Sequence, residues 1–315
     1  DPSRHPGSHR RSAMNRRGSV LIMSVWILAF FFTLTLSLAL YAAGHLKASS
    51  KNMTVFKSET AFLAGLDWVS RARAQDETSQ MDTPREGWLG KIRVPLSWRE
   101  DLEIHSEDEN SKLNINTASG LALIYLLKKV AGESVARDPE AAVKRLIEYR
   151  AAKPFEFLEE LTLIEGFSPG EAARLKPYLT IYEKSGPGNS GVNVNTASKE
   201  VLSALLFSFE GIDDSVKTRI LESVEAYRKS GNYFSETELT EENFIQKLGL
   251  EHTPEMNAAL SLFVRGLTAR SGLVRIEMNY KNKRTLNAVV DSSVDGAGRL
   301  PKILFWHESG AGHAF

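Results

Sequence analysis

The sequence predicts an α+β protein in which a long N-terminal helix packs on an antiparallel sheet, and a large all-α insertion divides the strands of that sheet. Three observations predict this fold: an uncharged segment near the N-terminus, strand-like segments on both sides of the middle, and a helical pattern that occurs twice in the middle. The 315 residues carry no net charge and no cysteine, which excludes disulfides, thiolate metal sites and cysteine catalysis.

The N-terminal segment has no Asp, Glu, Lys or Arg from Gly18 to His45. A membrane-spanning helix needs about 20 apolar residues, whereas the apolar part of a cleaved signal peptide has about 7 to 15. A buried core helix would have a polar face, which this segment lacks. We therefore predict a transmembrane helix over residues 19–45. The arginines before it keep the N-terminus in the cytoplasm: Arg10, Arg11, Arg16 and Arg17.

The helical pattern continues beyond the predicted membrane segment. Apolar residues keep helical spacing at Val55, Phe56, Phe62, Leu63, Leu66 and Val69, and no proline occurs from Ser19 to Met81. One helix from Ser19 to about Arg73 is expected, roughly 80 Å long at 1.5 Å per residue. Its second half has one apolar stripe, which must pack on another part of the chain. Residues 46–112 are predicted to hold this part of the helix and the first strands of the sheet.

The basic residues, Gly18 and the long helix together resemble the N-terminus of type IV pilin-like proteins. In that family a prepilin peptidase cuts after such a glycine. The resemblance therefore implies a leader of residues 1–18, cleavage between Gly18 and Ser19, and N-methylation of Ser19. Residues 1–13 belong to this leader or precede a start at Met14. Most members carry Glu at the fifth mature position, which is Met23 here.

The middle of the chain contains a duplicated module. The segment "LNINTAS" at 113–119 recurs as "VNVNTAS" at 192–198, and "LIEYR" ending at Arg150 recurs as "VEAYR" ending at Arg228. This spacing predicts an inserted helical domain at 113–261 with copies at about 113–191 and 192–261. The hydroxyls of Thr117 and Thr196 are expected to cap the helix that follows in each copy.

The two copies resemble helix-hairpin-helix (SAM-like) modules, and "LIEGFSPGEAARL" looks like one such hairpin. DNA-binding versions hold a phosphate at a helix N-terminus and need a basic surface. Residues 113–261 instead hold 16 Lys and Arg against 22 Asp and Glu, a net charge of −6. Acidic side chains stand at the hairpin turns, namely Glu165, Glu171, Glu251 and Glu255. No nucleic-acid partner is therefore expected.

Strand-like segments flank the insertion. "KIRVPLSW" and "DLEIHSEDENS" precede it, and "LVRIEMNY" and "RTLNAVVDSS" follow it, with "YKNKR" as the turn of a hairpin. These strands are expected to form one antiparallel sheet. Residues 262–315 are predicted to hold its terminal strands and a flexible, polar tail, "HESGAGHAF".

The order of segments resembles the minor pseudopilin K family of type II secretion along nearly the whole chain. The order is a leader glycine, an apolar helix, strands, "DENSKLNINTAS", a helical insertion and terminal strands. Members of this family also lack the Glu that Met23 replaces. The resemblance implies a subunit at the tip of the periplasmic pseudopilus that supports pseudopilus assembly and protein export. It also implies as partners other minor pseudopilins, prepilin peptidase and the inner-membrane secretion platform.

Sites of chemistry are scarce. The sequence has no G-x-S-x-G, H-E-x-x-H or P-loop motif, and its histidines have no ligand spacing, so no enzyme activity and no required cofactor are predicted. His105 is interpreted as a surface residue. Acidic runs leave calcium possible, with weak candidate ligands at Glu107, Asp108, Asp213 and Asp214.

The leading interpretation is a single-pass inner-membrane pseudopilin with a cytoplasmic N-terminus and a periplasmic C-terminal part. The alternative is a membrane-anchored DNA receptor built on the helix-hairpin-helix modules. A hydrolase with an unrecognised site is a third interpretation, supported only by the size of the chain.

Overall fold

The computed structural model describes residues 16–76, 78, 80–98, 100–131, 135, 137–183, 191–281, 284–291 and 302–310. Three predictions lie partly outside these residues: the leader before Arg16, the hairpin turn at 282–283 and the tail at 311–315. The chain forms two compact units, residues 1–59 and 60–315. Each unit is described by itself, and helix α1 (Arg16–Ala74) contributes residues to both.

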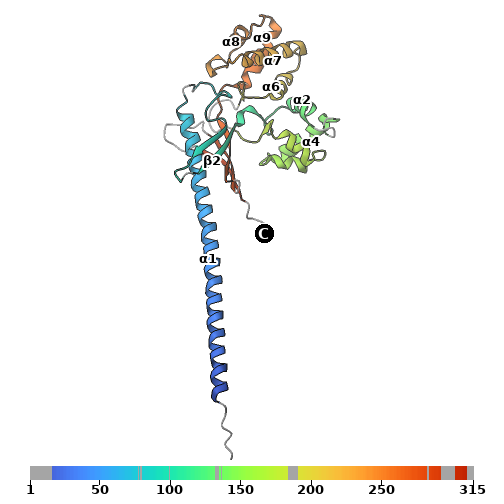
Figure 1. The fold of residues 1–315 in the computed structure, drawn as a ribbon. Helices are drawn as coiled ribbons and strands as arrows, with labels where there is room; N and C mark the ends of the chain where they lie inside the picture. The colour runs from blue at the N-terminus through green and yellow to red at the C-terminus, as the bar shows by residue number, and fades with distance from the viewer. Residues whose placement is uncertain are drawn as a thin grey trace, which may run out of the picture. The chain divides into compact units, whose positions relative to one another are not determined.

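Helix α1 is continuous over 59 residues, as the absence of proline predicts (Figure 1). Its apolar segment after Gly18 is long and apolar enough to cross a membrane, and the side chains there are exposed on all faces. The hydroxyls of Ser24 and Thr33 donate to the carbonyls of Val20 and Phe30 within the helix, both at 2.9 Å. Polar groups satisfied inside the helix suit a segment surrounded by lipid.

Five antiparallel strands form the sheet, in the order β1-β2-β7-β8-β9. Their bounds are β1 (Gly90–Pro95), β2 (Asp101–Asp108), β7 (Leu273–Tyr280), β8 (Arg284–Asp291) and β9 (Lys302–Gly310). Strand β2 pairs with β7, with Ile104 opposite Met278, although the whole insertion separates them in the chain. The prediction that strands from both sides of the insertion form one sheet is therefore confirmed.

One face of this sheet packs on the last part of α1. Phe62 and Leu66 are buried there against residues such as Leu102 and Met278. Burial of a side chain of this size contributes about 1.5–3 kcal/mol. Gly65 permits the close approach, because a Cβ at that position would lie 2.7 Å from Leu102 Cδ2 and from Met278 Sδ.

Strand β9 corrects the prediction of a flexible, polar tail that begins at His307. Residues His307 to Gly310 are the end of β9 and pair with β8, with His307 opposite Asn287. An edge strand is held by its backbone hydrogen bonds on one side and needs little apolar side-chain character, which is why its polar end did not read as a strand.

The insertion begins after β2 with a 3-10 turn, η1 (Glu109–Ser111), and continues through two copies of one module. Copy one contains β3 (Leu113–Asn114), α2 (Gly120–Val130), α4 (Pro139–Ala152), η2 (Leu158–Leu163), α5 (Pro169–Leu175) and β4 (Leu179–Thr180). Copy two contains β5 (Val192–Asn193), α6 (Lys199–Phe207), α7 (Asp214–Lys229), η3 (Glu236–Glu238), α8 (Glu241–Leu248), α9 (Pro254–Arg265) and β6 (Leu267–Thr268).

Each copy is closed by a short parallel strand pair, β3 with β4 and β5 with β6. Copy two therefore extends to Thr268, beyond residue 261 where the sequence interpretation ended it. Figure 1 shows α2 and α4 of copy one in green and α7, α8 and α9 of copy two in orange. The hydrophobic core of the insertion includes residues of both copies, such as Leu126 and Leu202.

The repeated Asn-x-Asn stretch fixes the loop before the first helix of each copy. Asn116 Oδ1 accepts from the Phe155 N–H at 2.8 Å, and its Nδ2 donates to the Phe155 carbonyl at 3.0 Å. Asn195 makes the same two bonds with Phe234, at 2.9 and 2.8 Å. One amide side chain thus satisfies both backbone groups of a residue 39 positions later in each copy.

The predicted helix caps at Thr117 and Thr196 are wrong. Ser119 and Ser198 cap α2 and α6, accepting from the N–H groups of Ala122 and Val201. The reason is that the Asn turn continues for two residues past the threonine before the helix begins. The Thr196 hydroxyl bonds Asp108 instead.

Candidate functional site: the junction between sheet and insertion

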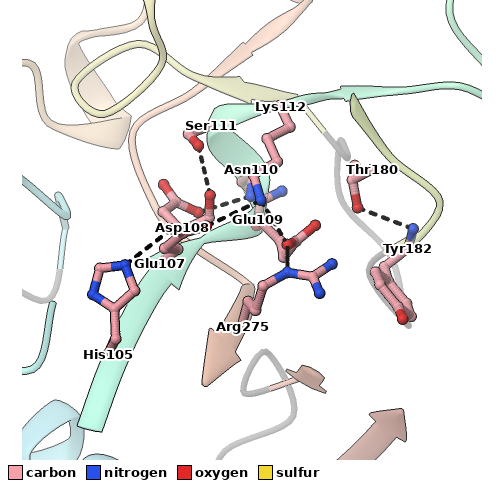
Figure 2. Close-up of polar contacts among 10 residues, drawn as sticks. All are labelled: His105, Glu107, Asp108, Glu109, Asn110, Ser111, Lys112, Thr180, Tyr182 and Arg275. Atoms are coloured by element: carbon pink, nitrogen blue, oxygen red, sulfur yellow. Dashed lines mark hydrogen bonds and ion pairs between the residues drawn. The ribbon is translucent and has the colours of Figure 1, made fainter. Parts of the chain in front are cut away.

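The chain leaves the sheet through a run of polar residues that is buried. Asp108 ends β2, and Glu109, Asn110 and Lys112 follow it, each less than one-tenth exposed. Figure 2 shows these side chains around the end of β2, with Arg275 of β7 approaching Glu109. Buried polar groups are costly unless every one is hydrogen-bonded, so their partners define the junction.

Asp108 connects the sheet to copy two. Its Oδ1 accepts from the Asn110 N–H at 2.8 Å, and its Oδ2 accepts from Asn193 Nδ2 at 2.9 Å and from the Thr196 hydroxyl. Burial nevertheless raises the pKa of this carboxyl above its ordinary value, because these donors are neutral and offset only part of the lost hydration.

Asn110 closes the other end of the insertion. Its Oδ1 accepts from the N–H groups of Gly272 and Leu273, at 2.8 and 2.9 Å, where the chain re-enters the sheet as β7. Its Nδ2 donates to the Gly191 carbonyl at 3.4 Å, just before copy two. A single side chain therefore binds two segments, at Gly191 and at residues 272–273, that are far from it in sequence.

Glu109 is fully buried and is paired with two cations. Its Oε1 accepts from Lys112 Nζ at 2.9 Å and from Arg275 Nε. Burial alone would raise the pKa of Glu109, but Lys112 and Arg275 together hold it below its ordinary value. Removing either cation would leave a buried charge only partly compensated, which is strongly destabilising in proteins.

A third buried carboxylate, Asp82, joins the end of α1 to the same region. It accepts from the Ser271 N–H, while the Arg73 guanidinium of α1 donates to the Ser271 carbonyl. Burial raises the pKa of Asp82, and Arg73 opposes that rise. Asn193 Nδ2 donates to the Ser271 hydroxyl at 3.1 Å. Asp82 and Arg73, which both bond Ser271, therefore belong to the same network as Asp108.

The four calcium candidates do not come together as a ligand set. Glu107 bonds His105 and Lys112, and Asp108 accepts the donors described above. Asp213 caps α7 through the Ser215 N–H, and Asp214 pairs with Lys217 at 3.1 Å. In the described part of the chain, no three His, Asp or Glu side chains gather where a metal ion would bind. These residues do not fit a calcium site.

The residues predicted for processing lie near the start of α1. Gly18 and Ser19 belong to the helix, which begins at Arg16, and the Met23 side chain is exposed. Sequence reasoning missed Asp82, Asn110 and Ser271 as junction residues. The sequence did hold one signal, the "DENS" run at 108–111, shortly before the first Asn repeat. Such a polar run can end a buried strand only if its side chains form hydrogen bonds within the protein.

No family model matches this chain, and no curated protein matches it in sequence. Among solved structures, the chain is similar to a chain in the crystal structure of the GspK–GspI–GspJ complex from the type 2 secretion system of enterotoxigenic Escherichia coli. The two share 13% identity with a TM-score of 0.56, over 84% of this chain and 99% of that chain. The likeness establishes a shared fold and confirms the predicted pilin-like α+β architecture with a large helical insertion.

Proposed function

We propose that this chain is a minor pseudopilin of a type II secretion system, located at the tip of the periplasmic pseudopilus. The observation that carries the proposal is one unbroken helix, apolar on all faces near its N-terminus and packed on a pilin-like sheet at its C-terminal end. Such a helix suits a subunit that is stored in the inner membrane and later buries its apolar surface against neighbouring helices in a fibre.

The partners in this proposal are two other minor pseudopilins. The similar solved structure is a complex of GspK with GspI and GspJ, which supports subunits of that class. Met23 stands where a Glu of a pilin-like subunit would attract the charged N-terminus of its neighbour. Without that Glu, and with the bulk of the insertion, this subunit suits the end position of a fibre and supports its assembly and protein export.

Processing by prepilin peptidase is the first test. Intact-mass measurement of the membrane-extracted protein, with and without the peptidase, is expected to show a mature chain that begins at N-methylated Ser19 only when the peptidase is present. A Gly18→Ala variant is the matched control and is expected to stay uncut. An uncut wild-type chain in cells that hold active peptidase would contradict the proposal and favour a plain membrane anchor.

The tip position has a separate test. Met23→Glu is expected to reduce tip placement, because the added carboxylate favours incorporation within the fibre, and secretion should fall several-fold. Met23→Leu keeps an apolar side chain and serves as the control. Pseudopili of normal length and normal secretion with Met23→Glu would count against the tip position.

DNA binding by the helix-hairpin-helix modules is the alternative, and α5 argues against it. Glu171 bonds the Ser168 N–H through its own carboxylate at 2.7 Å, at the helix N-terminus where a phosphate would have to bind. Duplex DNA binding by the detergent-solubilised chain at low salt is the discriminating measurement. Saturable binding that weakens steeply with salt would favour the receptor interpretation.

A further inference from the structure

The geometry points to a groove that binds an extended peptide segment of a partner protein, with a carboxylate held at one end and an apolar side chain at the other. The groove has a volume of about 740 Å³, within the range of small ligand sites, and is open to solvent. The inference does not depend on the proposed place in a secretion fibre.

Three parts of the second unit line this groove, which we call the junction groove. The sheet contributes Gly90, Glu107 and Arg275, copy one contributes Phe157 and Tyr182, and copy two contributes Thr196, Ser198 and Arg228, among others. A smaller cavity of about 270 Å³ continues from it and shares Pro84, Ala197, Ser198 and Arg228. The shared residues show that the two cavities adjoin, and two adjoining open cavities suit a length of chain better than a compact metabolite.

The copy-one wall of the junction groove is mostly apolar, apart from the paired Glu159 and Lys176. Phe157 is 49% exposed although it is a large aromatic residue, and Leu158, Pro177, Ile181 and Tyr182 line the groove with it. Phe305 of β9 lies beside Tyr182, with ring centroids 6.4 Å apart. Aromatic side chains that stay accessible in a groove are typical anchors for an apolar side chain of a bound peptide.

Most cations that line the junction groove are already neutralised. Lys112 and Arg275 pair with Glu109, as Figure 2 shows for Arg275, and Lys176 pairs with Glu159 at 2.5 Å. Burial raises the pKa of the Tyr182 phenol to about 12, so its hydroxyl stays protonated and can donate. These groups contribute hydrogen bonding to the groove but little unpaired charge.

Arg228 is the exception at the copy-two end. Its Nη1 donates to the Ala197 carbonyl at 2.8 Å, and among the described residues no carboxylate lies within ion-pair distance of it. The neighbouring acid, Glu225, is paired with Lys199 at 3.1 Å. The smaller cavity is therefore lined by Lys199, Arg228 and Lys229 against Glu225 alone, which leaves positive charge within a copy that is acidic overall.

The corresponding arginine of copy one shows that this arrangement is specific. Arg150 uses the same Nη1 for two carbonyls, those of Ile115 at 2.7 Å and Ala118 at 2.9 Å. Arg228 makes only one of these two bonds, and it lines both cavities. Among the residues that the structure describes, no group accepts from the other donors of Arg228. A guanidinium fork matches a carboxylate bidentately, so charge complementarity selects an acidic segment as the occupant.

Selection from a random seven-residue peptide library displayed on phage tests this inference, with the full chain immobilised in detergent micelles. Enriched peptides are expected to carry Asp or Glu near an aromatic or aliphatic residue. The best synthetic peptide should bind about tenfold or more tightly than its twin with Asn or Gln in place of the acid. Enrichment without acidic residues, or equal binding of the twins, would overturn the inference.

Matched variants locate the site. Arg228→Gln is expected to weaken peptide binding about tenfold or more, whereas Arg150→Gln leaves it unchanged. Since Arg228 also holds a loop, Phe157→Glu provides a second variant on the opposite wall, with exposed Leu163→Glu as its control. Phe157→Glu should weaken binding and Leu163→Glu should not. Equal effects within either pair contradict the inference, as does competition by succinate at the affinity of the peptide, which would mean a small-anion site only.

Discussion

The two copies of the inserted module share their internal bonds and differ in what they are attached to. Asn116 and Asn195 each hold the backbone of a phenylalanine in their own copy. The preceding asparagines diverge, because Asn114 donates to the Tyr182 carbonyl within copy one, whereas Asn193 donates to Asp108 and Ser271 at the junction. The same residue type thus closes one module and attaches the other to the sheet.

The two copies also differ in net charge. Residues 113–190 hold equal numbers of basic and acidic residues, whereas residues 191–268 hold 7 Lys and Arg against 12 Asp and Glu. Copy two therefore combines an acidic surface with the direct attachment to the sheet and with the positive end of the junction groove. The comparison indicates that the internal bonds define the module, while its outward contacts depend on what folds against each copy.

The largest expected difference between the copies is at the first asparagine. Asn193→Ala should lower the free energy of unfolding by about 2 kcal/mol, because it removes a donor from the fully buried Asp108 and the bond to Ser271, and Asn114→Ala by about 1 kcal/mol. Urea unfolding of the full chain in detergent, followed by tryptophan fluorescence, measures both. Equal losses would break the comparison, since they would mean that the junction bonds stabilise no more than an internal one.

The second asparagines are expected to behave alike. Asn116→Ala and Asn195→Ala each remove two bonds to buried backbone groups, so each should lower the free energy of unfolding by about 2 kcal/mol. The same urea titration applies, and Asn116→Asp, which loses the donor but keeps the acceptor, separates the two bonds. A much larger loss for one copy would show that the modules are not equivalent inside.

The smallest expected effect is a pH dependence that belongs to the attachment of copy two. Burial raises the native pKa of Asp108 above the unfolded value of about 3.9, so the native state binds this proton more tightly. The protonated Asp108 carboxyl therefore stabilises the native state fully below its unfolded pKa. This stabilisation is lost as pH rises through its native pKa. The stability of wild type relative to Asp108→Asn should therefore decrease by about 1 kcal/mol or more between about pH 4 and pH 7.

Shared groups such as Glu109 titrate in both proteins and cancel in this difference. A stability difference that stays constant or increases with pH would contradict the prediction. It would mean that the hydrogen bonds from Asn193 and Thr196 favour the ionised carboxylate more than burial disfavours it.

The sequence was sufficient for α1, for the flanking strands β1, β2, β7 and β8, and for the duplicated module, because each leaves a local pattern. The absence of proline predicted α1, alternation predicted β2 and β7, and the Asn-x-Asn repeat predicted the duplication. The sequence could not predict the hydrogen-bond partners of those asparagines. Asn114 and Asn193 occur in nearly identical segments and differ only in what folds against them. Strand β9 was not predicted for a similar reason, as the order of its polar end comes from pairing with β8.

The positions of β2 and β7 have a consequence for how such a chain can change. Asp108 and Val274 are paired residues of adjacent strands, so the insertion starts and ends about 5 Å apart. A short hairpin turn is sufficient to bridge that distance. The helical domain is therefore a cassette, meaning a segment whose replacement by a turn would leave the two strands paired. The pilin-like core is therefore free to acquire, lose or replace this cassette without a change in the register of its sheet.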